Sequence, residues 1–226
     1  MNLRRIADME ILVLGDSLPF GRPKHGICRD KTWPYLLRCE LDAHLCMRAR
    51  GGATSTDVLA EASGLASYWF GSLQARRFDV AFVQVGIVDA SPRLVPKPLY
   101  PYVSRLPGFS RLQRSRWLHE VVGRPWVSSG QFAQAIVRID ELLGRIAEQI
   151  FFVEIAFPDH HLKENVRNFS SLVSCRNLSI SSCIGESRFV SCWGGQAVPQ
   201  FLLPDGHHLN AEGHQVVAKK CLEKIS

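Results

Sequence analysis

Short apolar runs alternate along the chain with stretches in which apolar residues recur three or four positions apart. An unbroken apolar run is typical of a strand buried on both faces, whereas the wider spacing is typical of a helix with one buried face. These patterns predict strands at 10–14, 43–48, 78–85, 150–157 and 188–192. They predict helices at 33–41, 57–70 and 131–150, with a last helix that begins after residue 210.

Alternation of strands and helices predicts a parallel sheet covered by helices on both faces. The most regular helical stripe lies within 131–150 and comprises Phe132, Ile136, Ile139, Leu142, Leu143 and Ile146. Thr56 and Asn210 are the expected caps of the helices that follow them. With 226 residues, 46% of them hydrophobic, the chain is expected to form one domain spanning 1–226.

Composition narrows the class of protein. No apolar run reaches 18 residues, which excludes a conventional transmembrane helix, and the first ten residues lack the apolar stretch of a signal peptide, so a cytoplasmic location is expected. The seven cysteines have no Cys-x-x-Cys spacing. We therefore expect buried free thiols, with neither a disulfide framework nor a zinc site.

The segment 91–124 interrupts the alternation. Its five prolines exclude continuous regular structure, and it contains seven Lys or Arg residues against one acidic residue, a balance of +6 that equals the net charge of the whole chain. Aromatic residues lie between these cations. We expect a lid or recognition segment for an anionic partner, with Arg111, Arg114 and Arg116 as the contacting residues. A solvated or oligomer-contacting insertion is the alternative, and nucleic acid is not expected because no binding motif accompanies the charge.

Two motifs contain the residue types of a serine-nucleophile triad. Gly-Asp-Ser-Leu at 15–18 follows the first expected strand, and Asp-Gly-His-His-Leu-Asn occupies 205–210. A serine hydroxyl becomes a good nucleophile when a histidine accepts its proton and a carboxylate orients that histidine. Ser17, His208 and Asp205 could fill these roles, since open α/β folds place their sites at the carboxyl ends of strands. The Asp-x-x-His spacing favours His208 over His207 as the base.

Two further blocks, Gly-Gly-Ala-Thr-Ser at 51–55 and Gly-Ile-Val-Asp at 86–89, lie between these motifs. With the blocks in this order, the chain resembles the SGNH or GDSL hydrolases from about residue 9 to 218. The resemblance implies a flavodoxin-like three-layer α/β/α sandwich with a parallel sheet. It also implies serine esterase, deacetylase, lipase or acyltransferase activity that requires no metal or organic cofactor.

Carried over by position, the resemblance makes Ser17 the nucleophile and first oxyanion donor, and Gly52 a second donor through its backbone N–H. It makes His208 the general base and Asp205 the residue that orients it. The family places an asparagine, the third oxyanion donor, where this chain has Val88. Loss of one such donor typically costs a factor of about 10²–10³ in turnover.

Three outcomes follow from this valine. The two N–H groups suffice for an activated ester, or another group replaces the amide, or the chain no longer hydrolyses anything. Arg93 is the nearest candidate replacement along the sequence. Asp16, Gly86 and Asp89 are expected to support the nucleophile turn and the oxyanion loop through backbone hydrogen bonds.

The sequence therefore predicts a hydrolase that cleaves a short-chain acyl ester, such as an O-acetyl group on a saccharide or another anionic small molecule. An acyltransferase that uses the same acyl-enzyme is one alternative. A non-catalytic saccharide-binding or scaffold protein is the other.

Overall fold

A computed structural model describes residues 9–71, 78–113, 115–158 and 169–225. Its centre is a five-stranded sheet in the order β2-β1-β3-β4-β5, and every neighbouring pair is parallel. The strands are β1 (Glu10–Gly15), β2 (His44–Ala49), β3 (Phe78–Gln84), β4 (Ala147–Val153) and β5 (Phe189–Val190). This order confirms the flavodoxin-like arrangement expected from the sequence.

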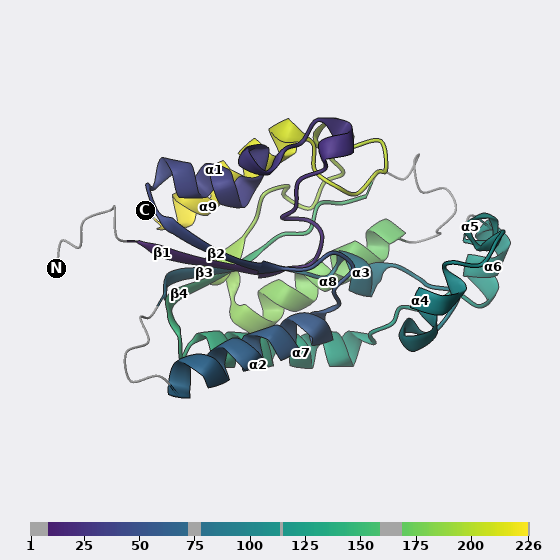
Figure 1. Ribbon diagram of the computed structural model, residues 1–226, viewed down its shortest axis with the longest axis horizontal. Helices are drawn as coiled ribbons and strands as arrows, with labels where there is room; N and C mark the ends of the chain where they lie inside the picture. Colours follow the sequence, from purple (N-terminus) through teal and green to yellow (C-terminus); the bar gives the residue numbers. More distant parts are fainter. Residues whose placement is uncertain (1–8, 72–77, 114, 159–168, 226) are drawn as a thin grey trace.

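Helices cover both faces of the sheet, which gives the three predicted layers. Figure 1 shows α1 (Trp33–Glu40) and α9 (Ala211–Ile225) on one face, with α2 (Ser55–Gly71), α7 (Ser129–Leu143) and α8 (Phe169–Ile184) on the other. Single 3-10 turns lie at Pro23–His25, Arg29–Lys31, Glu186–Arg188 and Pro199–Phe201. The central strands β1 and β3 are buried almost throughout, which explains their unbroken apolar runs, whereas the edge strand β2 is partly exposed.

Two expected boundaries are wrong. The helix expected at 131–150 ends at Leu143, and β4 begins at Ala147, so the fourth strand lies about three residues earlier than predicted. Ile146 and Ile150 are buried beyond the end of the helix and continue its apolar pattern across the turn, which hides the break. Helix α8 was not predicted, because its many serines weaken the apolar stripe.

Helix α2 begins at Ser55, so Thr56 lies inside it and the expected cap is wrong. The residue before the helix is Thr54, whose carbonyl accepts the N–H groups of Asp57 and Val58. The Thr54 N–H donates to the Asp57 carboxylate at 2.8 Å. The helix start is therefore stabilised by a side chain in its first turn that accepts the N–H of the preceding residue. At α9 the prediction is confirmed, because Asn210 Oδ1 accepts the Gly213 N–H at 2.9 Å.

Residues 91–124, here called the arm, form short helical pieces joined by turns, in keeping with their prolines. The pieces are a 3-10 turn at Lys97–Leu99 and the helices α4 (Tyr100–Val103), α5 (Phe109–Leu112) and α6 (Arg116–Val121). Figure 1 shows the arm leaving the body beyond α3 (Ile87–Ala90) and ending in α5 and α6, at the far side of the molecule from β1.

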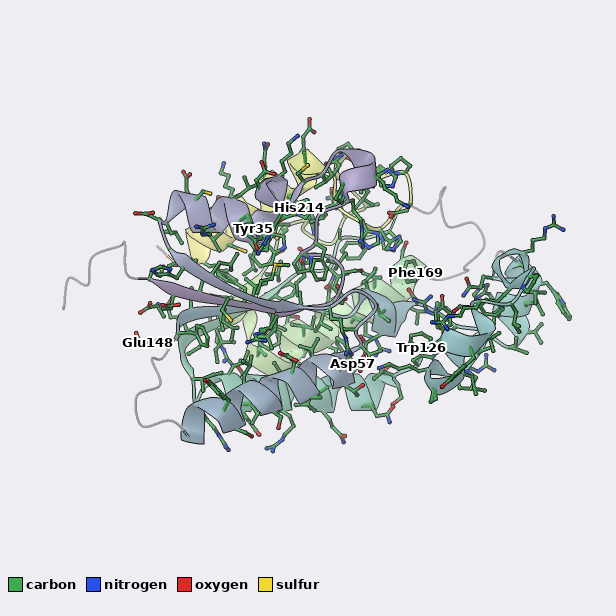
Figure 2. The ribbon with its side chains drawn as sticks, viewed as in Figure 1. Tyr35, Asp57, Trp126, Glu148, Phe169 and His214 are labelled. Atoms are coloured by element: carbon green, nitrogen blue, oxygen red, sulfur yellow. The ribbon has the colours of Figure 1, made fainter. Side chains whose placement is uncertain are left out.

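The base of the arm is firmly attached to the body. Arg93 and Arg124 exchange backbone hydrogen bonds of 2.9 and 3.0 Å, and the Trp126 indole donates to the Val95 carbonyl at 2.8 Å. Figure 2 labels Trp126 at this junction. Lys97 binds the side chains of Thr54 and Asp57 at the start of α2. The arm is therefore fixed where it begins.

All seven cysteines are free, as expected, but only Cys221 is fully buried. Cys28, Cys39 and Cys175 are exposed, so the expectation of buried thiols is wrong for them. The spacing of the cysteines along the sequence does not distinguish a buried thiol from an exposed one. In the described ranges, no helix combines the length and apolar character needed to span a bilayer.

Candidate active site

The nucleophile candidate follows the carboxyl end of β1, where the backbone turns sharply. The Asp16 N–H donates to the Gln84 carbonyl on β3, and the Asp16 carboxylate accepts the N–H groups of Leu18 at 2.9 Å and Gly86 at 3.2 Å. Asp16 thus connects the Ser17 turn to the loop after β3. Complete burial, with a contribution from nearby Asp89, raises the pKa of Asp16 to about 7.

Ser17, His208 and Asp205 form a continuous chain of hydrogen bonds. Ser17 Oγ lies 3.0 Å from His208 Nε2, and His208 Nδ1 lies 2.6 Å from Asp205 Oδ2. A carboxylate bound at Nδ1 holds the proton of the neutral ring on that nitrogen, which leaves the Nε2 lone pair directed toward the serine. His207 lies beside Asp205, with Nδ1 at 2.9 Å from the Asp205 carbonyl, so the geometry selects His208 rather than His207.

The loop that carries Asp205 and His208 is held by its own backbone. The Leu203 N–H donates to the His208 carbonyl at 2.7 Å, and Asp205 Oδ1 accepts the N–H groups of His207 and His208. Partial burial acts to raise the pKa of Asp205, but the hydrogen bond to His208 and the neighbouring imidazole of His207 outweigh it and lower this pKa well below its usual range. The Asp205 carboxylate is therefore ionised at neutral pH.

Two backbone N–H groups, one in the turn after β1 and one in the turn after β2, are free to donate. In the part of the chain that the structure describes, neither the Ser17 N–H nor the Gly52 N–H has an acceptor within the protein. Gly52 has φ +74°, a conformation that L side chains rarely adopt, and it belongs to a turn closed by the Ala53 N–H and the Arg50 carbonyl. Free N–H groups beside a nucleophile are the elements of an oxyanion hole.

The loops after β2 and β3 are joined by a buried carboxylate. Asp89 accepts the Ser55 N–H at 3.0 Å and the Ser55 hydroxyl at 2.6 Å. Burial raises the pKa of Asp89, although the bonds from Ser55 oppose this effect. Gly86, with φ +129°, leaves no room for a side chain, because a Cβ there would lie 2.6 Å from the Ile155 side chain.

Arg176 is a structural support that the sequence analysis missed. It lies on α8, is 3% exposed, and donates to the carbonyls of Asp89 at 3.2 Å and Val127 at 3.0 Å. It thereby binds the oxyanion loop to the segment where the arm returns to the body. No motif marked it, since it lies in a helix that was itself not predicted.

The structure places Val88 and Arg93 in different surroundings. Val88 is 4% exposed and packs in the core beside the nucleophile turn. The Arg93 guanidinium stacks on the rings of Trp126, at 5.0 Å, and Tyr100, at 5.7 Å. No described contact joins Arg93 to Ser17 or His208, so its role as a replacement oxyanion donor stays a prediction.

A second arginine, not predicted from the sequence, reaches the histidine. Arg22 Nη2 lies within hydrogen-bond distance of His208 Nε2, the same atom that faces Ser17. The sequence held one signal for it, because Arg22 lies in the loop directly after the Gly-Asp-Ser-Leu motif.

The helices α5 and α6, which carry two of the predicted recognition residues, lie at the outer end of the arm (Figure 1). Arg111 is exposed on α5, and Arg116 begins α6. Arg114 and the side chain of Arg116 lie outside the described residues. A surface cavity of about 520 Å³ runs along β2 and α2 and reaches Gly15 and Ala53, the neighbours of the nucleophile turn and the oxyanion turn, but neither Ser17 nor His208 lines it.

One group of described residues has the spacing of metal ligands, and it shares Asp205 and His208 with the chain of hydrogen bonds from Ser17. The ligand atoms of Asp205, His207 and His208 lie within 4.8 Å of one another. Asp205 Oδ2 and His208 Nδ1 already bind each other at 2.6 Å. A metal there would have to replace the bond that orients His208.

His214 packs behind the site on α9, where Figure 2 labels it. Its Nδ1 accepts the Trp33 N–H at 3.2 Å, and burial, together with the charges of His208 and Arg22, lowers its pKa to about 4. His214 is therefore a neutral acceptor that links α9 to α1.

We compared the chain with known protein families, protein sequences and solved structures. Neither a family model nor a curated protein sequence matches the chain. Solved structures do match it along nearly their whole length. A lipase/acylhydrolase from Enterococcus faecalis has a TM-score of 0.62 at 13% identity, with 96% of this chain and 95% of that chain covered.

Two further solved structures give the same result. A member of the lipolytic G-D-S-L family from Veillonella parvula has a TM-score of 0.59 at 13% identity, covering 95% of this chain and 97% of its own. A catalytic mutant of Axe2, an acetylxylan esterase from Geobacillus stearothermophilus, has a TM-score of 0.58 at 13% identity, with 96% and 94% covered. The chain therefore has the fold of these hydrolases.

Proposed function

We propose that this chain, which has the fold of the GDSL-type hydrolases, is a serine esterase that cleaves a short acyl ester through Ser17, His208 and Asp205. The observation that carries the proposal is the geometry of the three side chains, with 3.0 Å between Ser17 Oγ and His208 Nε2 and 2.6 Å between His208 Nδ1 and Asp205 Oδ2. These residues come from loops 191 positions apart in the sequence. A bond network of this kind supports nucleophilic catalysis.

In the first half of the reaction, Ser17 Oγ attacks the ester carbonyl carbon while its proton passes to His208 Nε2. The carbonyl oxygen becomes negatively charged and accepts the N–H groups of Ser17 and Gly52. Collapse of this intermediate breaks the bond to the alcohol, which takes the proton from His208. Water then repeats the sequence on the acyl-enzyme, releasing the acid and restoring Ser17.

Two backbone donors, without the amide that Val88 replaces, suffice most readily for an activated ester. The resemblance to the GDSL hydrolases favours a short acyl group, such as an acetyl group on a saccharide. The Axe2 structure, which is that of an acetylxylan esterase, supports the same substrate class. The excess of cations in the arm supports an anionic saccharide or another anionic small molecule.

Substitution Ser17→Ala tests the proposal. We expect it to abolish hydrolysis of 4-nitrophenyl acetate and labelling by a neutral fluorophosphonate, while the circular dichroism spectrum stays unchanged. Ser181→Ala is the matched control, since Ser181 is a partly exposed serine on α8 whose hydroxyl donates to the Leu178 carbonyl in its own helix. Hydrolysis by Ser17→Ala at the wild-type rate would contradict the triad.

The same assay separates the alternatives. A product in which the acyl group has moved to an added alcohol or sugar, at the expense of free acid, would identify an acyltransferase. Failure of the wild-type protein to react with the fluorophosphonate would instead favour a saccharide-binding or scaffold protein.

A further inference from the structure

Arg22 is held in place by the loop that follows the nucleophile. Its backbone forms an isolated antiparallel bridge with Ile27, with hydrogen bonds of 2.7 and 3.1 Å, and Gly26 closes the turn in a left-handed conformation. Pro23 follows directly and restricts the backbone further. The guanidinium therefore projects from a fixed point toward His208.

Arg22 and Ser17 converge on one acceptor. His208 Nδ1 is bound to Asp205, so in the neutral ring Nε2 offers a single lone pair. Ser17 Oγ lies 3.0 Å from Nε2, and Arg22 Nη2 is also within hydrogen-bond distance of it. A guanidinium is always charged and can only donate. With no ester bound, Arg22 thus competes with Ser17 for the lone pair that must accept the serine proton.

The charge of Arg22 has no partner of opposite sign in the described part of the chain. Among the described residues, no acidic side chain lies within ion-pair distance of Arg22, although the side chain is only partly exposed. Other arginines near α2 and α7 do have carboxylate partners, as Arg50 has Asp57 at 3.1 Å and Arg188 has Asp140 at 2.6 Å. An unpaired guanidinium beside a nucleophile is suited to an anionic group supplied by a ligand.

The position of Arg22 identifies the side of the substrate that carries the anion. Nε2 of the base must lie next to the leaving oxygen, because it returns the proton there, whereas the free N–H groups of Ser17 and Gly52 face the carbonyl oxygen. A group in contact with Nε2 therefore lies against the alcohol portion of the ester.

We propose that Arg22 binds an anionic group, a carboxylate or a phosphate, on the alcohol portion of the substrate, and that this binding draws Arg22 away from His208 and leaves the Nε2 lone pair to Ser17. The inference rests on the proposed function and specifies its substrate. It makes Arg22 a specificity residue that also holds the empty site in a less reactive state.

The experiment compares three acetyl esters that differ at one carbon, namely 3-O-acetyl glucose, 3-O-acetyl glucuronate and 3-O-acetyl glucose 6-phosphate. We expect Arg22→Gln to lower kcat/KM for at least one anionic ester by about 10–100-fold, the loss expected for one charge-assisted hydrogen bond. We expect the same variant to raise kcat/KM for the neutral ester a few-fold, since the shorter, neutral glutamine amide competes less for the Nε2 lone pair than the charged guanidinium does. The anionic ester that loses more identifies carboxylate or phosphate as the ligand.

Two control variants and one control substrate complete the experiment. Lys24→Gln removes a charge from an exposed residue of the same loop and should change none of the three rates. Arg22→Lys keeps the charge without the planar fork, so it should fall between wild type and Arg22→Gln for the anionic esters. An ester with its carboxylate on the acyl side, 4-nitrophenyl hemisuccinate, should not lose rate in Arg22→Gln as the anionic sugar esters do.

Equal losses on neutral and anionic esters would overturn the inference and make Arg22 an oxyanion donor or a structural residue. A binding measurement keeps the test independent of turnover. In a Ser17→Ala background, glucuronate or glucose 6-phosphate should bind at least ten-fold more weakly once Arg22 is changed to Gln. Equal binding of these anions with and without the Arg22→Gln change would overturn the inference. Failure of the wild-type protein to react with the fluorophosphonate would instead overturn the proposed function.

Discussion

The loops around Ser17 and the arm at 91–124 use their polar side chains in opposite ways. Around the serine, the carboxylates of Asp16, Asp89 and Asp205 each accept at least two hydrogen bonds from backbone or side chains of the protein. In the arm, large apolar side chains are exposed beside the basic residues. They are Leu99, Tyr102, Leu106, Leu112, Trp117, Val121 and Val122.

Internally bonded polar groups suit reaction chemistry, whereas exposed apolar side chains suit contact with a partner. Catalytic groups need fixed positions, which internal hydrogen bonds supply, and those bonds leave few groups free. A contact surface needs side chains that gain partners only on binding, and Trp117, which is 67% exposed, has the exposure that such a surface requires. Arg22 combines the two patterns, because its backbone is fixed and its guanidinium has no carboxylate partner among the described residues.

The largest expected effect is on kcat and lies in the hydrogen-bonded loops around Ser17. Asp205→Asn should lower kcat by up to about 10⁴-fold, because an amide at Nδ1 favours the wrong tautomer of His208. The measurement is steady-state hydrolysis of 4-nitrophenyl acetate. Retention of most of the activity would mean that Asp205 only holds the loop through its bonds to the backbone of 207 and 208.

A smaller effect is expected at the oxyanion loop. Val88→Asn places an amide at the position that the related motif uses as a third donor, and it should raise kcat on simple activated esters by up to about 100-fold. Because Val88 is buried, the variant should also unfold at a lower temperature. If the rate stays level while Arg93→Ala is severely impaired, Arg93 is the replacement donor.

A third substitution tests whether the arm acts through charge. Changing Arg111, Arg114 and Arg116 together to Glu should raise KM several-fold for an anionic ester and remove most of its salt dependence, since the screening length is about 8 Å near physiological ionic strength. Turnover of a neutral ester should be affected much less. Equal losses on both esters would show that the arm shapes the site, and Trp117→Ser would then separate apolar contact from charge.

The smallest effect is expected where the arm joins the body. The pKa of Asp57 is lowered to about 2, because bonds from Lys97 and Thr54 outweigh its partial burial. The stabilising contribution is therefore complete above about pH 4 and is lost as the pH falls through 2. Lys97→Ala should lower the free energy of unfolding at pH 7 by about 0.2–1 kcal/mol, and this difference should vanish near pH 2. A difference that persists unchanged in acid would exclude the ion pair as its source.

The sequence predicted the fold better than it predicted the site. The positions of β1 and β3 followed from apolar runs, because central strands of a parallel sheet are buried on both faces, and the flavodoxin-like arrangement was implied by the family resemblance. The end of α7 was missed because Ile146 is buried beyond it, and α8 was missed because serines interrupt its apolar face. In each case tertiary burial overrides the local pattern.

The motifs pointed to Ser17, Asp205 and His208, and to the supporting residues Asp16 and Asp89, but not to two arginines around them. Arg22 and Arg176 belong to no motif, and their contacts join segments separated by 186 and 87 residues. The place of Arg22 directly after the Gly-Asp-Ser-Leu motif does not indicate which distant residue it contacts. Arg93 was proposed because it is near the oxyanion block along the chain, and its guanidinium lies instead against Trp126 and Tyr100.

The hydrogen bond between Ser17 and His208 joins residues that leave the ribosome at different times. At about 5–20 residues per second, the 191 residues that follow Ser17 up to His208 take about 10–40 s to add. Under the proposed mechanism, the nascent chain carries Ser17 without its base during that interval and therefore cannot attack an ester. The proposed triad is completed only when the loop of His208 reaches the end of β1, a contact between distant segments that is slow to form.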